Sequence, residues 1–346
     1  MVGRKRKSRK KKKPSAAPIL LAVLAVALLT AGLGVWAVLA PFGPAQETFV
    51  EVPNGSSTAR IGQLLEKEGV IRSKYAFELV RFWKRGTLRA GEYRFDRPMP
   101  VSEVYARIAR GDVFTKTVTF PEGSTIFDVA ARLEQAGLGQ RKDFLDAAAQ
   151  QTSLIKDLDP GATSLEGYLF PDTYHFARKA TPEQICATMV RRFRTVAAQL
   201  GLEEHVHKVV TLASLVERET ALESERPLVA SVFDNRLAKN MPLMTDPAVI
   251  YGLQREGRWR GTIYKSDLAY DTAYNTYMHK GLPPGPIANP GAKSLRAAMN
   301  PAHTDFLYFV AAGANPQGHS VFSVDLKQQN QNVAGYRHAV KRAGGR

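Results

Sequence analysis

The sequence predicts an α+β protein with a single apolar helix at its N-terminus, followed by small strand–helix units and then by a mixed α+β domain. Three observations lead to this prediction. An uncharged run follows a strongly basic N-terminus, two segments of the first half repeat at an offset of 68 residues, and the second half consists of short blocks rich in aromatic, glycine and proline residues. The boundaries that we expect are residues 1–17 for a basic tail, 18–40 for a transmembrane helix, 41–116 and 117–160 for two strand–helix units, and 161–346 for the mixed domain.

The N-terminus has the pattern of a membrane anchor. Nine basic residues lie between Arg4 and Lys13, and the uncharged run extends from Pro18 to Ala40. As a helix that rises ~1.5 Å per residue, this run covers the ~30 Å hydrocarbon core of a bilayer. The apolar part of a signal peptide is shorter, roughly 7–15 residues, so we expect an uncleaved span. Because basic residues stay on the cytoplasmic side, we predict a single-pass inner-membrane protein whose remaining chain is extracytoplasmic and whose anchor contacts membrane lipid.

Charge and motif content exclude several classes of function. The formal net charge is +16, and without the nine basic residues of the tail it is +7, which suits an anionic polymer, a phospholipid surface or simply a solvated face. Nucleic-acid binding, which a pI of 9.9 suggests, is excluded because the densest charge precedes the predicted span. No dinucleotide, phosphate-loop or zinc-protease motif is present, so we expect no metal and no cofactor. The single Cys186 cannot form a disulfide within one chain.

The first half contains a repeat of one supersecondary unit. The segments that begin at Val50 and Val118 match in register, including both residues of a Pro-x-Gly turn. Each copy predicts a short strand, this turn, a helix capped by Ser or Thr, and a closing glycine. Gly91–Phe95 and Ser102–Ala109 predict a returning strand and a helix that complete the first unit. Units of this kind resemble LysM modules, which implies binding of N-acetylated glycan chains, while a purely structural spacer remains the alternative.

One helix of the second half carries a carboxyl group into its own apolar side. At 100° per residue over Val206–Thr220, six aliphatic residues cluster on one side and Glu217 projects from the middle of that side, whereas Glu219 falls on the polar side with Ser214 and Arg218. A carboxyl group in a dry setting has a raised pKa and can donate a proton. Glu217 is therefore the candidate general acid. The alternative is that its side chain bends out to water from the last helical turn.

Aromatic side chains gather in the loops around this helix. Flat amphipathic rings in loops could line a groove and stack on sugar faces, although ordinary half-burial is the alternative for each of them. The tyrosines in question are Tyr168, Tyr174, Tyr251, Tyr274 and Tyr277.

Several long motifs, in this order, resemble the endolytic murein transglycosylase (MltG, YceG-like) family. They extend from about Phe49 to Arg337 and comprise LEGYLFPDTY, ASLVERET, SER with VASVFDNRL, TDPAVIYG, YNTY with GLPPGPIANPG, LYFVAA, and His319 with Phe322. Two positions depart from the family. Met244 stands where glutamine is usual, and Gln328 to Asn330 stand where Glu-His-Asn is usual, so we assign no catalytic histidine there.

The resemblance implies a membrane-anchored lyase with a mixed α+β catalytic domain that cuts peptidoglycan glycan strands internally. The bond would be the one between N-acetylmuramic acid and N-acetylglucosamine, and the product would carry a 1,6-anhydro end. The catalytic glutamate of ASLVERET is assigned to Glu217. The resemblance also implies work beside peptidoglycan synthases. Residues assigned to substrate binding are Glu166, Tyr168, Asp246, Tyr251, Asn275 and Tyr277.

A lytic transglycosylase can work with one carboxyl group, whereas a glycoside hydrolase needs two. Asp246, Glu166 and Asp172 remain available as a second carboxylate, so the sequence leaves open whether the product is anhydro-ended or hydrolysed. An alternative of another class is a membrane-anchored peptidoglycan-binding scaffold that holds partners without turnover.

Overall fold

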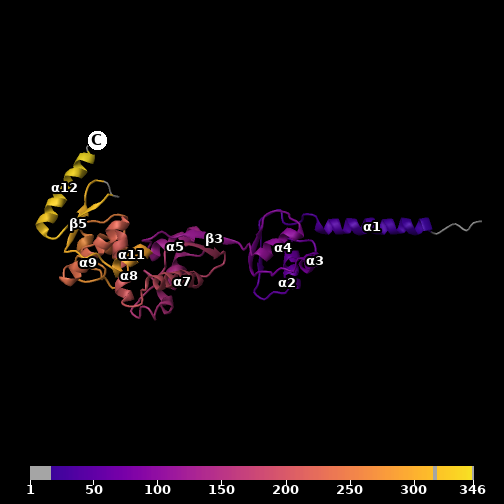
Figure 1. Ribbon diagram of the computed structural model, residues 1–346, viewed down its shortest axis with the longest axis horizontal. Coiled ribbons are helices and arrows are strands. Elements are labelled where there is room, and N and C mark those ends of the chain that lie inside the picture. Colours follow the sequence, from indigo (N-terminus) through magenta and orange to yellow (C-terminus); the bar gives the residue numbers. More distant parts are fainter. Residues whose placement is uncertain (1–16, 315–317, 345–346) are drawn as a thin grey trace, which may run out of the picture. The chain divides into compact units, whose positions relative to one another are not determined.

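The computed structural model describes residues 17–314 and 318–344, and the chain divides into two compact units, Met1–Phe114 and Thr115–Arg346 (Figure 1). The predicted basic tail lies outside the described residues, except for its last position. Helix α1 (Ala17–Leu39) coincides closely with the uncharged run, and its apolar side chains from Leu20 to Trp36 are largely exposed. Among the described residues, no helix was found with the length and hydropathy that crossing a membrane requires.

The rest of the first unit is a two-stranded antiparallel sheet with helices connecting and following the strands. Its elements are β1 (Thr48–Val52), α2 (Thr58–Lys67), α3 (Lys74–Lys84), β2 (Gly91–Phe95) and α4 (Val101–Arg110). The inward side chains of both strands join the helices in one hydrophobic core that includes Leu65, Phe77 and Tyr93. The strand and helix predicted to complete this unit are confirmed as β2 and α4.

The second unit begins with the same order of elements. These are β3 (Thr115–Thr119), α5 (Ile126–Gln135), α6 (Arg141–Gln150) and β4 (Thr173–Ala177), with β3 and β4 paired antiparallel. The predicted repeat is therefore a repeated β–α–α–β arrangement. However, the returning strand of the second copy follows an insertion that contains η1 (Gln151–Leu154), so it lies beyond residue 160. Residues 117–160 and 161–346 consequently share one compact unit instead of forming two.

Both copies use the same local chemistry at the turn before their first helix. The hydroxyl groups of Ser56 and Ser124 donate to the carbonyl oxygens of Pro53 and Pro121, at 2.8 Å and 2.7 Å. The glycine inside each turn has a φ of +74° or +77°, a conformation that side chains disfavour. A Ser or Thr then caps each helix by accepting a backbone N–H of the first turn. The sequence identities thus preserve a turn and a helix start.

The remainder of the second unit is mainly helical. Figure 1 shows α8 and α11 close together within this unit, and α8 packs against α9, α10 and α11. Its elements are α7 (Pro182–Leu200), α8 (Val206–Glu219), η2 (Glu223–Glu225), α9 (Arg226–Ala238), α10 (Asp246–Arg255), η3 (Asp267–Ala269), α11 (Ala292–Met299), β5 (Tyr308–Ala311), β6 (Ser320–Ser323) and α12 (Leu326–Gly344). Cys186 lies in the core of this unit, where burial raises the pKa of its thiol to about 12.

Helix α8 is more deeply buried than its sequence pattern indicates. Every residue from Val210 to Val216 is buried, including Ser214, which the helical projection placed on the polar side. The Ser214 hydroxyl donates to the Thr211 carbonyl oxygen at 2.7 Å and accepts the Ile287 N–H at 3.0 Å. A small polar residue can face the protein interior when its hydroxyl is satisfied in this way. The middle of the helix is thus enclosed on several sides, and its first and last turns reach the surface.

Replacing Gly167 by alanine should strongly destabilise the second unit. Its φ is +87°, and an added Cβ would lie 2.5 Å from Pro286 Cγ and 2.8 Å from Val210 Cγ1. The left-handed conformation and the overpacking together should lower the free energy of unfolding by about 2–4 kcal/mol, measured by urea denaturation. Gly257→Ala is the control, since its φ is +67° but its Cβ would meet nothing within 4 Å. Equal losses for both variants would contradict the close packing.

Candidate active site

The last turn of α8 carries Glu217, whose carboxylate is buried and held from two sides. The Arg226 guanidinium donates to Glu217 Oε1 at 2.8 Å, and the backbone N–H of Gly291 donates to Oε2 at 3.0 Å. The Glu217 side chain is only 5% exposed, so its predicted burial is confirmed and the alternative that it bends out to water is wrong. Burial raises the pKa of Glu217, while the Gly291 N–H and the Arg226 charge oppose this shift.

Arg226 and Gly291 make this arrangement compact. Arg226 is itself buried, and its Nη2 also lies 3.5 Å from Glu122 Oε2. An added Cβ at Gly291 would lie 1.9 Å from Glu122 Oε1, so a larger residue there would displace the Glu122 side chain. Glu217 therefore joins the end of α8 to the start of α9 and to the segment before α11. Both of its oxygens already accept hydrogen bonds, which is the environment of an anchoring carboxylate.

Two residues further on, Glu219 has a different environment. Its side chain is half-buried, and within the described part of the chain its carboxyl group makes no hydrogen bond or ion pair. Burial raises the pKa of Glu219 to about 7, the Asp246 charge raises it further, and Arg236 and Arg218 oppose the shift. A carboxyl group with a pKa near neutrality can both donate and accept a proton at physiological pH. Glu219 is thus a second candidate general acid beside Glu217.

The neighbours of Glu219 come from two loops that are bonded to each other. The Tyr277 hydroxyl donates to Asp246 Oδ1 at 2.6 Å, and the Thr276 hydroxyl oxygen accepts the Thr245 N–H at 2.9 Å. Asp246 is the exposed first residue of α10, where Thr245 caps the helix. Burial and Asp246 both raise the pKa of the Tyr277 phenol. We refer to Glu219, Asp246 and Tyr277 as the acidic cluster.

The helical projection missed Glu219 because it counted only the residues of α8. On that projection Glu219 lies on the polar side, but in the fold the start of α10 and the loop of Tyr277 lie near that side. Arg236 of α9 also faces it, with its guanidinium held by the carbonyl oxygens of Leu307 and Leu243 at 2.7 Å and 2.6 Å. Burial by tertiary neighbours cannot be derived from the periodicity of one helix. In the sequence, only the motif LMTDP drew attention to the loop that leads into α10.

Of the six residues predicted to bind substrate, only Asp246 and Tyr277 lie together at the surface. Glu166 is buried, and its two oxygens accept the Ile126 N–H at 2.9 Å and the Asn289 side-chain amide at 3.0 Å. Burial raises the pKa of Glu166 to about 8. Glu166 therefore ties the start of α5 to the segment before α11, and it presents no free group to a sugar.

The other three predicted contacts are also core residues. Tyr168 is fully buried and donates to Asp159, and Tyr251 packs edge-on against Tyr274 with ring centroids 5.0 Å apart. Asn275 donates from its amide to the carbonyl oxygens of Leu268 and Tyr270, at 3.1 Å and 2.8 Å. These side chains shape the loops from inside. The expected tyrosine-lined groove is wrong, because four of its five tyrosines are buried and only Tyr277 is partly exposed.

Met244, which stands where the family usually has glutamine, lies beside the acidic cluster. Its side chain is 49% exposed, its φ is +55°, and its N–H donates to the Thr276 carbonyl oxygen at 3.1 Å. A left-handed conformation at a residue other than glycine is uncommon and requires support from its surroundings. An exposed apolar side chain therefore lies two residues before Asp246.

A polar cavity of about 430 Å³ adjoins the last turn of α8 on the side of the second repeat. It is bordered by Arg218, whose Nη1 donates to the Gly123 carbonyl oxygen at 3.2 Å. Its other lining residues are Pro121, Glu122, Gly123, Ser124, Asp128, Ala131, Arg132 and Gln135. The turn of the second β–α–α–β copy thus lies beside Glu217 and Arg218 in the last turn of α8.

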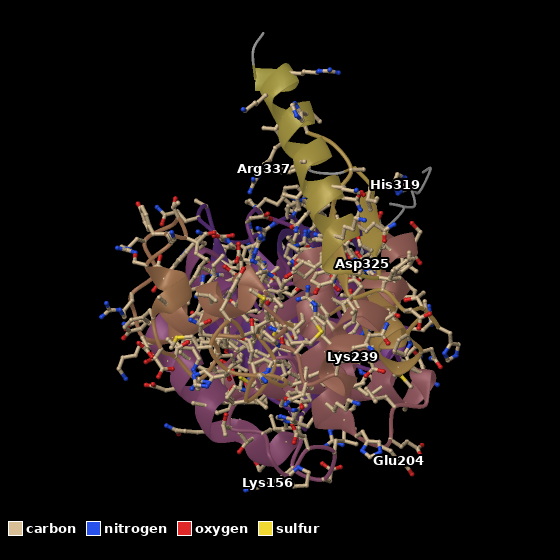
Figure 2. The ribbon with its side chains drawn as sticks, turned by 90° about the vertical axis from the view of Figure 1, so that its left-hand side faces the viewer. Lys156, Glu204, Lys239, His319, Asp325 and Arg337 are labelled. Atoms are coloured by element: carbon tan, nitrogen blue, oxygen red, sulfur yellow. The ribbon has the colours of Figure 1, made fainter. Side chains whose placement is uncertain are left out.

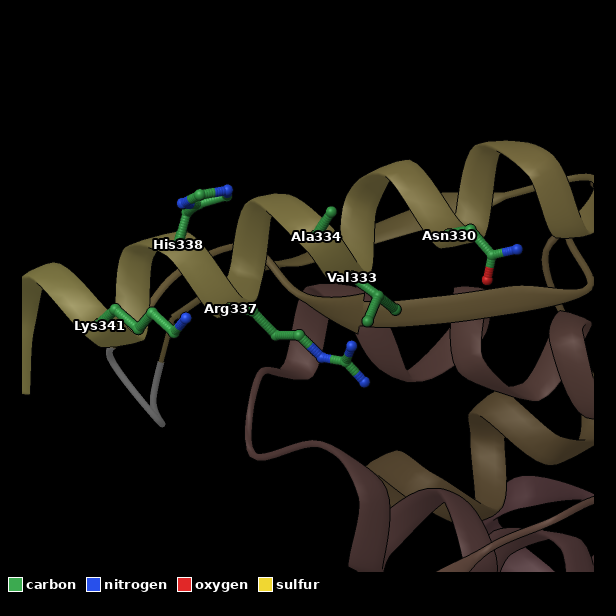
Figure 3. Close-up of a pocket in the computed structure, with 6 residues that line it drawn as sticks. All are labelled: Asn330, Val333, Ala334, Arg337, His338 and Lys341. Atoms are coloured by element: carbon green, nitrogen blue, oxygen red, sulfur yellow. The ribbon is translucent and has the colours of Figure 1, made fainter.

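Another cavity of about 430 Å³ follows α12, which Figure 2 shows projecting from the body of the second unit with Arg337 along it. Figure 3 shows that the lining side chains are Asn330, Val333, Ala334, Arg337, His338 and Lys341. None of these residues bears a carboxyl group, so this cavity is no candidate for acid catalysis. Among residues 17–314 and 318–344, no group of three or more His, Cys, Asp or Glu side chains could hold a metal ion.

A half-buried carboxyl group with a pKa near neutrality, beside a surface carboxylate and a phenol, defines an acid–base site. The chain belongs to the YceG-like family, whose model matches residues 50–335, so the family predicted from the sequence motifs is confirmed. The chain is 34% identical over 303 residues to the endolytic murein transglycosylase of Bacillus subtilis, with 82% of each chain covered. It is 30% identical to the enzyme of the same name from Streptococcus pneumoniae, of which the match covers 57%.

A solved structure has the same fold. The crystal structure of a YceG-like protein from Listeria monocytogenes superposes with a TM-score of 0.54 at 32% identity, covering 83% of this chain and 99% of that one. The mixed α+β class predicted from the sequence is thereby confirmed.

Replacing Asp246 by asparagine should lower the pKa of Glu219, because it removes a negative charge that disfavours ionisation of Glu219. The carboxyl ¹³C shift of Glu219, followed over pH, measures this change. Asp271→Asn, at an exposed site paired with His279, is the control and should leave the titration unchanged. A Glu219 titration near the ordinary value of 4.5 in the wild type would contradict the assigned environment.

The same pKa predicts how stability depends on pH. Between about pH 4.5 and 7, Glu219 keeps its proton in the folded chain and loses it in the unfolded chain. The contribution of this group to the free energy of unfolding is therefore largest below pH 4.5 and is lost as pH rises towards 7. Glu219→Gln should remove this part of the pH dependence, measured by urea denaturation at several pH values. An unchanged dependence would show that Glu219 titrates alike in both states.

Proposed function

We propose that this chain is an endolytic murein transglycosylase. It would cut peptidoglycan glycan strands internally, between N-acetylmuramic acid and N-acetylglucosamine, and leave a 1,6-anhydro-N-acetylmuramic acid end. Family membership and the names of its curated relatives support the reaction class. The observation that carries the proposal is the half-buried carboxyl group of Glu219, which has no bonding partner among the described residues and a pKa of about 7.

We assign the proton donor to Glu219 and a positioning role to Glu217. The motif ASLVERET contains both glutamates, and the sequence-based assignment chose Glu217 both for its place on the apolar side of α8 and from the resemblance of the motif to the family. In the fold, the Glu217 oxygens accept hydrogen bonds from Arg226 and Gly291, and both contacts favour the ionised form over the protonated form that donates. Glu219 is the glutamate of the motif whose oxygens remain available to a ligand.

The mechanism needs only one titrating carboxyl group. Glu219 gives its proton to the bridging oxygen, the glycosidic bond at C1 breaks, and an oxocarbenium-like centre develops on the muramic acid. The Glu219 carboxylate then takes the proton of the C6 hydroxyl of the same sugar, and that oxygen forms the new bond to C1. Because the nucleophile is tethered to the reacting ring, the step gains the effective concentration of an intramolecular reaction.

The neighbours of Glu219 prepare it for this cycle. The negative charge of Asp246 favours the protonated form of Glu219, as the first step requires. Asp246 is held by the Tyr277 hydroxyl, so its charge has a fixed position next to the acid. We propose Asp246 and Tyr277 as substrate contacts as well, since both are accessible at the same edge.

We further propose that the N-terminal 40 residues hold the chain at the inner membrane, with the basic tail cytoplasmic and the second unit extracytoplasmic. The uncharged run and the exposed apolar side chains of α1 support this placement. The two β–α–α–β copies would bind glycan in the manner of LysM modules, and the chain would work beside peptidoglycan synthases. The alternative, a glycan-binding scaffold without turnover, draws on these same two copies.

Glu219→Gln should abolish strand cleavage, because the amide keeps the shape of the side chain and loses the acid. A loss of at least about 10²-fold is expected for removal of a general acid. Full-length protein in detergent is incubated with purified glycan strands, and the products are weighed by mass spectrometry. Anhydro-ended fragments support the proposal, plain reducing ends would indicate a hydrolase, and binding without cleavage by the wild type would indicate the scaffold.

Glu217→Gln should instead destabilise the fold, because it leaves the buried Arg226 guanidinium with the more distant and half-exposed Glu122 as its remaining counter-charge. Breaking a buried ion pair from one side costs about 3–5 kcal/mol in the free energy of unfolding, and urea denaturation measures it. The double variant Glu217→Gln with Arg226→Met should recover much of this loss, since neither charge then remains. A stable but inactive Glu217→Gln protein, together with an active Glu219→Gln protein, would return the donor role to Glu217.

A further inference from the structure

Helix α3 of the first unit has an exposed apolar side, which the described part of the chain approaches only where α1 lies beside Tyr75 and Leu79. Tyr75, Leu79, Phe82 and Trp83 are between 57% and 79% exposed. At 100° per residue these four positions fall within one narrow side of the helix. Four large apolar side chains together form a patch of the kind that marks an interaction surface, in contrast to scattered single ones. We refer to them as the α3 patch.

Another side of α3 already supplies the core. Ala76 and Phe77 are buried there, and Val80 packs against the same core. A surface helix ordinarily has a polar side opposite its buried one. The α3 patch lies between this core side and the polar side that carries Lys74, Glu78 and Arg81, so it adds apolar surface outside the core of this unit.

Positive charge surrounds the α3 patch. Six basic residues and one acidic residue, Glu78, lie between Arg72 and Arg89, which gives this segment a net charge of +5. Two of the cations lie over aromatic rings, Lys74 over Tyr75 at 5.0 Å and Arg85 over Phe82 at 6.0 Å from the ring centroids. Tryptophan, tyrosine and phenylalanine rimmed by lysine and arginine are typical of helices that lie at the boundary between headgroups and acyl chains.

The α3 patch continues into the apolar surface of α1. A cavity of about 430 Å³ is lined jointly by these two helices of the first unit. Its lining residues are Ala31, Gly34, Val35 and Leu39 of α1 together with Ser73, Tyr75, Ala76 and Leu79. Two members of the patch thus share one apolar surface with the helix that we propose to be at the membrane.

We infer that the α3 patch docks the first unit on an anionic lipid bilayer, with Trp83 and Phe82 inserted at the headgroup boundary. The inference rests on the proposed membrane location and not on the proposed reaction. A lipid surface fits better than a glycan strand because sugar sites combine a ring with hydrogen-bonding side chains. The segment from Arg72 to Arg89 contains no asparagine or glutamine, and an aliphatic residue, Leu79, lies within its patch.

The three tryptophans of this chain allow a direct test in the full-length protein. Trp36 lies in α1, Trp83 in α3 and Trp259 in the second unit. Three proteins are prepared that each keep one tryptophan and have phenylalanine at the other two positions. They are mixed with phosphatidylglycerol vesicles whose acyl chains are brominated, and tryptophan emission is recorded. Trp83 should shift to shorter wavelength and lose most of its emission, whereas Trp259 should keep its emission.

The outcomes separate this inference from the proposed anchor. Quenching of Trp36 without quenching of Trp83 would overturn docking by α3 and leave the anchor in place. Quenching of neither, or equal quenching of Trp83 and Trp259, would also overturn it. Leu79→Glu in the Trp83 protein should restore emission, while Glu78→Gln, one residue away, should not. A Trp83 response to soluble glycan strands and not to vesicles would assign the patch to glycan binding instead.

Discussion

The fold around the candidate site depends on one buried charge interaction, the contact of Glu217 with Arg226 and with the Gly291 amide. The three groups come from the end of α8, the start of α9 and the segment before α11. Because a buried charge is costly without its partner, these elements cannot separate independently. The interaction fixes the direction in which the last turn of α8 leaves the core, and with it the position of Glu219. The contacts of Glu217 therefore also influence where Glu219 lies.

Much of the architecture could be predicted from the sequence, because it is encoded locally. The Pro-x-Gly turns and their Ser or Thr caps lie within a few residues of each other, so the 68-residue repeat shows both their presence and their form. The α8 helix was predicted to within one residue at each end, since its aliphatic spacing is regular. The family was identified because several long motifs agree in order, and the family model confirms it.

The details of the site were harder to predict from the sequence, because its side chains are buried by residues that are distant in the sequence. A helical projection places Ser214 and Glu219 among polar residues, but the loop of Ile287 buries the first and the neighbourhood of Asp246 raises the pKa of the second. The sequence around the five tyrosines did not indicate whether their side chains line a groove or lie in the core. Only Tyr277 of the five is partly exposed, since its hydroxyl meets Asp246 at the edge of the loop.

The position of β4, which follows the insertion in the sequence, limits where this protein can be cut into fragments. In the first copy the partner strand follows its helices directly, but in the second copy the partner of β3 arrives only at Thr173, beyond the insertion. A fragment cut between these points would leave the N–H and C=O groups along β3 without a neighbour, and such open strands invite pairing with other molecules. The second β–α–α–β copy therefore cannot be transferred to another protein without the rest of its unit. Recombination or gene fusion can separate the chain cleanly only near Phe114.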